Sequence, residues 1–139
     1  MTIKEDDVVA DIGTGCGIIP LILLLKRPVK YAYGLEIQWE LAYQAARNAL
    51  LNDYPDRMGV ITGDLRNPPL AASWADVVIC NPPYRRKDSG RINPDQQRAI
   101  ARHEILASLD DILTTAKRIL KPRGRFAMIY PVERFNDLM

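Results

Sequence analysis

The residues best suited to chemistry form a tetrapeptide, Asn81-Pro82-Pro83-Tyr84, directly after an apolar run at 77–80. Such a run predicts a buried strand, and open α/β sheets bind ligands beyond the carboxyl ends of their strands. The Asn81 side-chain oxygen and the Pro82 carbonyl oxygen can each accept one N–H, while the Tyr84 ring can stack on a planar group. The tetrapeptide therefore predicts a site for a planar, amino-bearing group. The alternative is a simple turn at the end of a strand, for which Asn-Pro is a common signal.

A glycine-rich turn lies near the start of the chain, between the first predicted strand and the first predicted helix. Asp11 is followed by glycine at three alternate positions, Gly13, Gly15 and Gly17. Glycine lets the backbone approach a ligand and adopt φ angles that a Cβ atom disfavours. A dinucleotide-binding turn would also need glycine at position 18, which is Ile18. The observed spacing instead resembles the turn of Rossmann-like methyltransferases, which bind S-adenosylmethionine.

Acidic residues close the first three predicted strands, and we expect their carboxylates to meet at one edge of the sheet. They are Asp11, Glu36 and Asp64. An ionised carboxylate only accepts hydrogen bonds, so this edge would repel a pyrophosphate and suit ribose hydroxyls, an ammonium group and an adenine amino group. We expect Glu36 to accept from both ribose hydroxyls and Asp64 from the adenine amino group, while Asp11 orients the glycine turn. Ile37 and Leu65, which follow two of these acids, are further expected cofactor contacts. Helix capping or plain solvent exposure is the alternative for each acid.

Strand and helix patterns alternate along the chain. The predicted strands cover 8–12, 31–35, 58–62, 76–80 and 126–130. The predicted helices cover 18–26, 39–51 and a long segment from Asn93 to about residue 120. Such alternation predicts an α/β fold with a doubly wound parallel sheet.

The composition favours one globular, reduced domain. The chain has 139 residues, 47% of them hydrophobic, and a net charge of +2, so we expect a single domain over 1–139. Cys16 and Cys80 are too few for a disulfide framework and lack the paired spacing of a zinc site, and no metal site is expected. No apolar run approaches the roughly 18 residues of a membrane span. We therefore expect a cytoplasmic protein without a membrane segment.

With these features together, the sequence resembles the class I S-adenosylmethionine-dependent amino-methyltransferases, and most of all the bacterial tRNA adenine-N6 methyltransferases that act on a valine tRNA. Four further stretches carry the closer resemblance: Gly34-Leu35-Glu36-Ile37-Gln38, Ala46-Arg47-Asn48, Ala101-Arg102-His103-Glu104 and Tyr130-Pro131-Val132-Glu133-Arg134. The resemblance implies the strand order 3-2-1-4-5, the cofactor S-adenosylmethionine, and methyl transfer to the exocyclic amine of an adenine in tRNA. Asn81, Pro82 and Tyr84 would be the catalytic residues, with Asn81 also near the cofactor.

A basic segment agrees with a nucleic-acid partner. Between positions 85 and 102 the chain has six basic and two acidic residues, a net of four positive charges beside the tetrapeptide. This excess fits an RNA backbone, and a merely solvated loop is the alternative.

The resemblance also leaves alternatives. The tetrapeptide is shared with protein glutamine methyltransferases that act on release factors, and a catalytically incomplete cofactor-binding core is a further possibility. Members of the family usually have an N-terminal segment and seven strands, so we expect a core truncated at both ends. The predicted fifth strand would then lie at an open edge of the sheet, through which two copies could pair as a homodimer.

Overall fold

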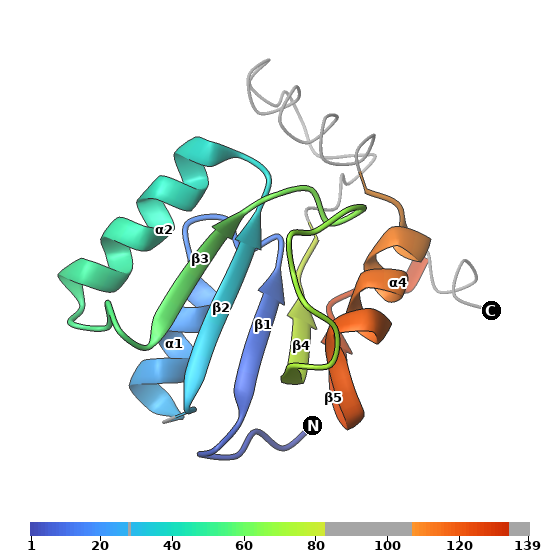
Figure 1. Cartoon of the computed structure of the whole chain (residues 1–139), viewed down its shortest axis with the longest axis horizontal. Coiled ribbons are helices and arrows are strands. Elements are labelled where there is room, and N and C mark those ends of the chain that lie inside the picture. Colours follow the sequence, from blue (N-terminus) through green and yellow to red (C-terminus); the bar gives the residue numbers. More distant parts are fainter. Residues whose placement is uncertain (28, 83–106, 134–139) are drawn as a thin grey trace.

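The chain folds around a five-stranded sheet in which all neighbouring strands are parallel (Figure 1). The computed structural model describes residues 1–27, 29–82 and 107–133. The strands are β1 (Val8–Ile12), β2 (Tyr31–Glu36), β3 (Met58–Thr62), β4 (Ala75–Cys80) and β5 (Leu120–Met128). Their order is β3-β2-β1-β4-β5, so the winding direction changes between β1 and β4. The predicted fold class and strand order are confirmed, and this switch point is where such sheets bind ligands.

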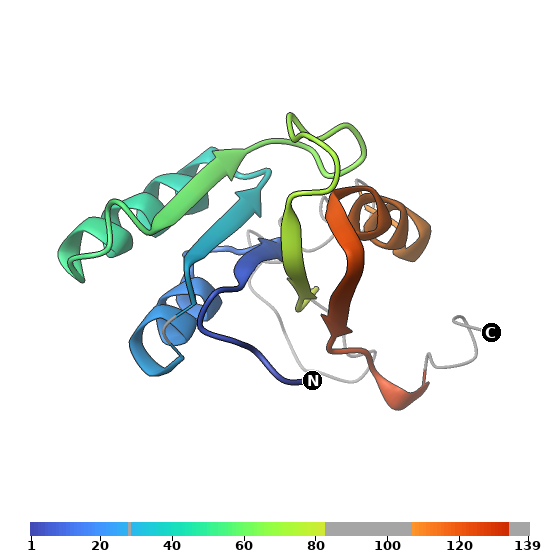
Figure 2. The same cartoon turned by 60° about the horizontal axis from the view of Figure 1, so that its bottom comes forward.

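Helices cover both faces of the sheet (Figure 2). They are α1 (Ile18–Lys26), α2 (Trp39–Leu51) and α4 (Leu109–Ile119). On one face, Leu21 of α1 and Ala45 of α2 share a buried core with Val9. On the other, Ile119 of α4 shares a core with Ile12. Burial of each large aliphatic side chain contributes about 1.5–3 kcal/mol, so the two cores hold the strand ends in register. No helix in the described ranges is long and apolar enough to cross a membrane.

The helix before β5 differs from its prediction. The sequence pattern predicts one helix from Asn93 to about residue 120, but Ala107 and Ser108 are not helical and α4 begins at Leu109. Ser108 caps the helix through a capping box, in which its hydroxyl accepts from the Asp111 N–H and the Asp111 carboxylate accepts from the Ser108 N–H. Two reciprocal hydrogen bonds satisfy two helix-end donors and fix this start. Asn93 lies outside the described residues.

The last strand begins earlier than predicted and ends earlier as well. The sequence pattern predicts the end of a helix at about residue 120 and a strand at 126–130, whereas β5 runs from Leu120 to Met128. The pairing with β4 moves from Ala75–Leu120 to Val77–Arg125, so an irregular segment is inserted within the strand. Arg123 there has a φ of 67°, a left-handed conformation that is uncommon outside glycine. A Lys-Pro-Arg-Gly stretch therefore interrupts the ladder locally without ending the strand.

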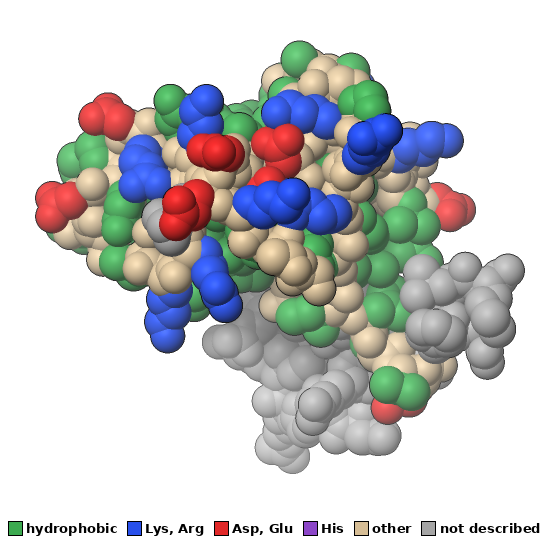
Figure 3. Space-filling model, turned by 90° about the horizontal axis from the view of Figure 1, so that it is seen from below, with side chains coloured by type: hydrophobic (Ala, Val, Ile, Leu, Met, Phe, Trp, Pro, Cys, Tyr) green, Lys and Arg blue, Asp and Glu red, His purple; other side chains and the backbone are tan. Residues whose placement is uncertain are grey.

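Two ion pairs connect β1, β4 and β5 near the amino ends of β1 and β4. Asp7 is buried and its carboxylate lies 2.5 Å from a guanidinium nitrogen of Arg125. Asp76 accepts from the Val8 N–H at 2.9 Å and from the Lys121 ammonium at 3.0 Å. Figure 3 shows Lys, Arg, Asp and Glu side chains gathered together at this lower end of the molecule. These contacts join β1, β4 and β5 at the end opposite to the predicted site.

Candidate functional site

The glycine turn leaves β1 and is held against β2. The N–H groups of Gly13 and Thr14 both donate to the Leu35 carbonyl, at 2.9 and 3.1 Å. Gly13, Gly15 and Gly17 have φ angles of 74°, 59° and 82°, which glycine adopts without the steric cost of a side chain. The alternating glycines are thus explained by backbone conformation.

Glu36 connects the glycine turn to the end of β2. Its side chain is buried, with only 3% of the residue exposed. One carboxylate oxygen accepts from the Gly15 N–H at 2.8 Å, and the other accepts from the Gln38 N–H at 2.9 Å. Each oxygen of an ionised carboxylate can accept two hydrogen bonds, so both retain capacity for a ligand. Glu36 therefore orders the turn and still has acceptors for the predicted pair of hydroxyls.

Two residues that the sequence analysis missed make this arrangement possible. A Cβ atom at Gly34 would lie 2.4 Å from the methyl group of Thr14, so only glycine in β2 lets the turn approach this closely. Thr14 itself is buried, and its hydroxyl has no hydrogen-bond partner among the described residues. Gly34 belongs to one of the stretches that carry the family resemblance. Its packing role could not be predicted from the sequence, because it depends on Thr14, 20 positions earlier in the chain.

Asp11 lies deeper than a ligand contact would require. Only 1% of the residue is exposed, and within the described ranges neither carboxyl oxygen has a hydrogen-bond partner. Burial raises the pKa of Asp11 to about 7; the Thr14 hydroxyl opposes this increase without reaching hydrogen-bonding geometry, and the negative Glu36 carboxylate adds to it. An unpaired buried carboxyl is costly when ionised, so Asp11 carries a proton over much of the range below neutral pH.

Asp64 is the most exposed of the three acids. Its carboxylate accepts from Nε and Nη2 of the Arg66 side chain, with the shortest contact at 2.6 Å, and from the Arg66 backbone N–H at 2.9 Å. This hydrogen bonding by Arg66 lowers the pKa of Asp64 below its usual value, so the side chain is ionised at neutral pH. A ligand at Asp64 would therefore have to share the carboxylate with Arg66 or displace the guanidinium.

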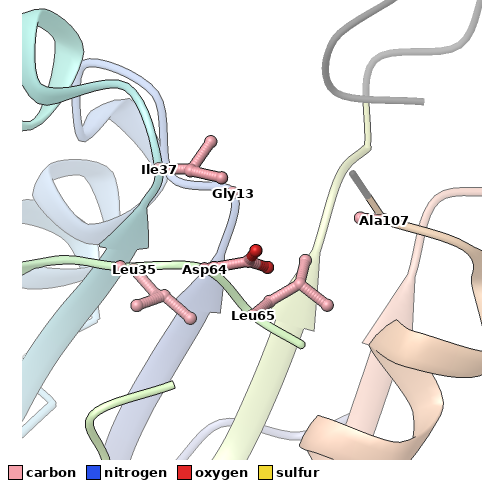
Figure 4. A pocket seen from close by; sticks show the side chains of 7 residues that line it. Gly13, Leu35, Ile37, Asp64, Leu65 and Ala107 are labelled. Atoms are coloured by element: carbon pink, nitrogen blue, oxygen red, sulfur yellow. The ribbon is translucent and has the colours of Figure 1, made fainter. Parts of the chain in front are cut away.

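A pocket opens at this edge of the sheet (Figure 4). Its lining residues are Gly13, Leu35, Ile37, Gly63, Asp64, Leu65 and Ala107. Ile37, Asp64 and Leu65 come from segments that follow β2 and β3, and Ala107 faces them from the segment before α4. The walls are mainly apolar with a carboxylate at one side, which suits a flat group that carries hydrogen-bond donors. The structure brings four predicted cofactor contacts together here, while the buried Asp11 and Glu36 do not line the pocket.

The tetrapeptide begins at the same edge. Ile12 of β1 is paired with Cys80 of β4, so the next residues, Gly13 and Asn81, both leave the sheet here. Asn81 is exposed, Pro82 is half-buried, and the Ile129 N–H donates to the Cys80 carbonyl at 3.1 Å. Tyr84 and the basic segment at 85–102 lie outside the described residues.

Cys80 is not placed for nucleophilic chemistry. Cys80 is buried, and this burial, with a smaller contribution from Asp11, raises the pKa of its thiol to about 12. It is therefore a neutral packing residue near neutral pH. Over residues 1–27, 29–82 and 107–133, His, Cys, Asp and Glu form no cluster of three that could hold a metal ion.

Comparisons with known proteins agree with this fold. The model of the "Methyltransferase small domain" family matches residues 1–134. A Porphyromonas gingivalis protein named tRNA1(Val) (adenine(37)-N6)-methyltransferase is 36% identical over 132 residues, covering 92% of this chain and 51% of that protein. A Bacteroides fragilis protein of the same name is 34% identical over 136 residues, covering 94% and 56%. The chain thus spans about half the length of these curated relatives.

A solved structure shows the same fold. The S-adenosylmethionine-dependent methyltransferase from Thiobacillus denitrificans, crystallised with S-adenosyl-L-homocysteine, superposes with a TM-score of 0.64 at 18% identity. The match covers 91% of this chain and 42% of that one. Because the family model extends over nearly the whole sequence, the chain belongs to the methyltransferase small domain family.

Proposed function

We propose that this chain binds S-adenosylmethionine and transfers its methyl group to the exocyclic amine of an adenine in tRNA. The observation that carries the proposal is the acidic edge of the sheet, where Glu36 accepts a hydrogen bond from the glycine turn and Asp64 lines the pocket. The cofactor complements these carboxylates, because it offers hydrogen-bond donors, namely two ribose hydroxyls and an amino group, together with positive charge. A dinucleotide would instead place its pyrophosphate against three acids.

The adenine in tRNA is supported by the relatives. Proteins named as tRNA1(Val) (adenine(37)-N6)-methyltransferases are 36% and 34% identical to this chain over more than nine-tenths of its length. The beginning of the tetrapeptide, Asn81 and Pro82, leaves the sheet beside the glycine turn, where an acceptor amine would meet the cofactor. This chain covers only about half of each relative. Activity on tRNA is therefore proposed and is not inferred from their names alone.

The proposed chemistry assigns separate roles to the tetrapeptide. When bound, S-adenosylmethionine supplies an electrophilic methyl group. The Asn81 side-chain oxygen and the Pro82 carbonyl each accept one N–H of the target amine. These contacts hold the nitrogen lone pair toward the methyl group and stabilise the positive charge that develops on nitrogen. Tyr84 stacks on the base, which has to leave any base-paired stack to reach it.

The decisive experiment is transfer of a radiolabelled methyl group to total tRNA, followed by nucleoside analysis. The expected product is N6-methyladenosine. Purified release factor serves as the competing acceptor, since the same tetrapeptide would suit a glutamine amide. Cofactor binding without transfer to either acceptor would indicate a catalytically incomplete core, and absence of cofactor binding would reject the proposal.

We also propose that two copies can pair along β5. This strand lies at one edge of the described sheet, and an edge strand can pair with another chain through its free backbone groups. Analytical ultracentrifugation should show a concentration-dependent dimer. A proline at Met128, the last residue of the strand, should weaken it, because strand alternation from the inward-facing Ile129 N–H turns the Met128 N–H to the open edge. A monomer at every concentration tested would contradict the pairing.

A further inference from the structure

The carboxyl group of Asp11 is a buried acid without a partner. Only 1% of the residue is exposed, and both of its oxygens and the neighbouring Thr14 hydroxyl lack hydrogen-bond partners within the described part of the chain. An ionised carboxylate in such a place loses its hydration, and the nearby Thr14 hydroxyl offsets only part of that cost. The geometry alone therefore calls for a proton on Asp11 or for a positive charge nearby.

The surrounding elements supply no positive charge. Glu36 at the end of β2 acts on Asp11 with a negative charge, and the Cys80 thiol of β4 is neutral. Thr14, on the turn after β1, offers only a hydroxyl. The ion pairs described above, which involve Arg125 and Lys121, lie at the amino ends of the strands. Among the described residues, no Lys or Arg acts on Asp11.

A ligand on the glycine turn can supply that charge. Asp11 is two residues from Gly13, and consecutive Cα atoms are about 3.8 Å apart, so the turn lies within about 8 Å of Asp11. An opposite charge within about 4–6 Å typically lowers the pKa of an acid by 1–3 units. S-adenosylmethionine carries a sulfonium and an ammonium against one carboxylate, which leaves a net charge of +1.

We infer that Asp11 is protonated in the free protein below neutral pH and that binding of S-adenosylmethionine releases this proton. The inference rests on the proposed function. On binding, the O–H bond of Asp11 breaks, its electron pair stays on the carboxylate, and the proton passes to solvent. Asp11 is a positioning residue, because its negative charge acts on the ligand electrostatically across the glycine turn and without direct contact. The raised pKa of about 7 in the free protein fits this scheme.

The coupling has a defined pH dependence. Below the pKa of Asp11 in the free protein, binding must displace a proton, so affinity should rise by up to tenfold per pH unit. Above that pKa the carboxylate is already ionised, and affinity should become independent of pH. Between pH 6 and pH 8 the affinity should therefore increase by roughly tenfold.

Isothermal titration calorimetry in two buffers with different ionisation enthalpies measures the protons released. For the unchanged protein we expect close to one proton at pH 6 and almost none at pH 8.5. Asp11→Asn should bind with no proton release at either pH. 5′-Methylthioadenosine, which keeps the nucleoside but has neither positive charge, should release far less than S-adenosylmethionine. S-adenosylhomocysteine, which keeps only the ammonium, separates the contributions of the two cations.

The outcomes separate this inference from the proposed function. Binding without proton release at pH 6, or equal release from Asp11→Asn, would overturn the inference and leave the proposed function standing. Absence of binding at any pH would overturn both. A measurement without ligand is also available, since ¹³C NMR of the Asp11 carboxyl should show titration near pH 7 in the free protein, and titration near pH 4 would overturn the inference.

Discussion

Replacing Asp11 with asparagine is expected to change how the stability of the free protein depends on pH. In the folded protein, burial raises the pKa of Asp11 from 3.8 to about 7. In the unfolded chain the side chain is solvated and titrates at its usual value. The folded state therefore binds the proton more tightly than the unfolded state does. A group of this kind destabilises the fold as pH rises above the unfolded pKa, and the loss is complete above the folded pKa.

The magnitude follows from the shift of about three pKa units. Each unit corresponds to 1.36 kcal/mol, so ionised Asp11 costs the free protein about 4 kcal/mol above pH 7. Between pH 5 and pH 8 the loss should be about 3 kcal/mol, against a typical total stability of 5–15 kcal/mol. Asparagine has nearly the same shape and does not ionise, so this part of the pH dependence should vanish in Asp11→Asn.

Urea unfolding at several pH values tests the expectation. The difference in free energy of unfolding between variant and unchanged protein cancels all other acids, and we expect it to grow by about 3 kcal/mol from pH 5 to pH 8. Equal m-values would show that the two unfolded states are comparable. If the two stability curves stay parallel within about 0.5 kcal/mol, Asp11 has an ordinary pKa and the reasoning from burial fails.

Three further predictions follow from other contacts. Glu36→Ala should weaken S-adenosylmethionine by about 2–3 kcal/mol, as calorimetry would show, because it removes charged acceptors; unchanged affinity would exclude Glu36 as the ribose ligand. Asn81→Ala should lower the methyl-transfer rate while leaving cofactor affinity nearly unchanged, since its contact strengthens as the amine reacts; normal turnover would refute that role. Asp7→Asn should lower the free energy of unfolding by about 2–3 kcal/mol because it breaks a buried ion pair, whereas Lys121→Met, in a more exposed pair, should cost less than about 1 kcal/mol. Equal losses in chemical denaturation would contradict this distinction.

The sequence predicted the fold well where local patterns decide it. The strands at 8–12 and 58–62 and the helices at 18–26 and 39–51 have the predicted bounds. Apolar runs and helical periodicity are set by nearby residues, whereas the strand order came from the family resemblance.

The failures have both local and distant causes. Periodicity favours a helix through Ala107 and Ser108, but a local capping box between Ser108 and Asp111 makes α4 begin at Leu109. No strand is predicted at 121–124, yet β5 continues through this segment, since pairing with β4 occurs on both sides of it, at Leu120 and from Arg125. At the site, the sequence identified the acids from their positions after strands. It could not show that Glu36 binds the glycine turn or that Gly34 makes room for Thr14, because both depend on the approach of β1 to β2.

The negative charge of each of the three acids at the edge of the sheet is compensated in a different way. This difference affects how each acid would interact with a ligand. Glu36 is held by two backbone N–H groups and retains acceptor capacity on both oxygens, so a ligand can add contacts without displacing a partner. Asp64 is paired with the exposed side chain of Arg66, so a ligand there competes with an existing ion pair. Asp11 has only a proton for compensation, so a positive ligand can make it ionise without moving any residue. We therefore expect Glu36 to contribute most to affinity, Asp64 to contribute least, and Asp11 to set the dependence of binding on pH and on the charge of the ligand.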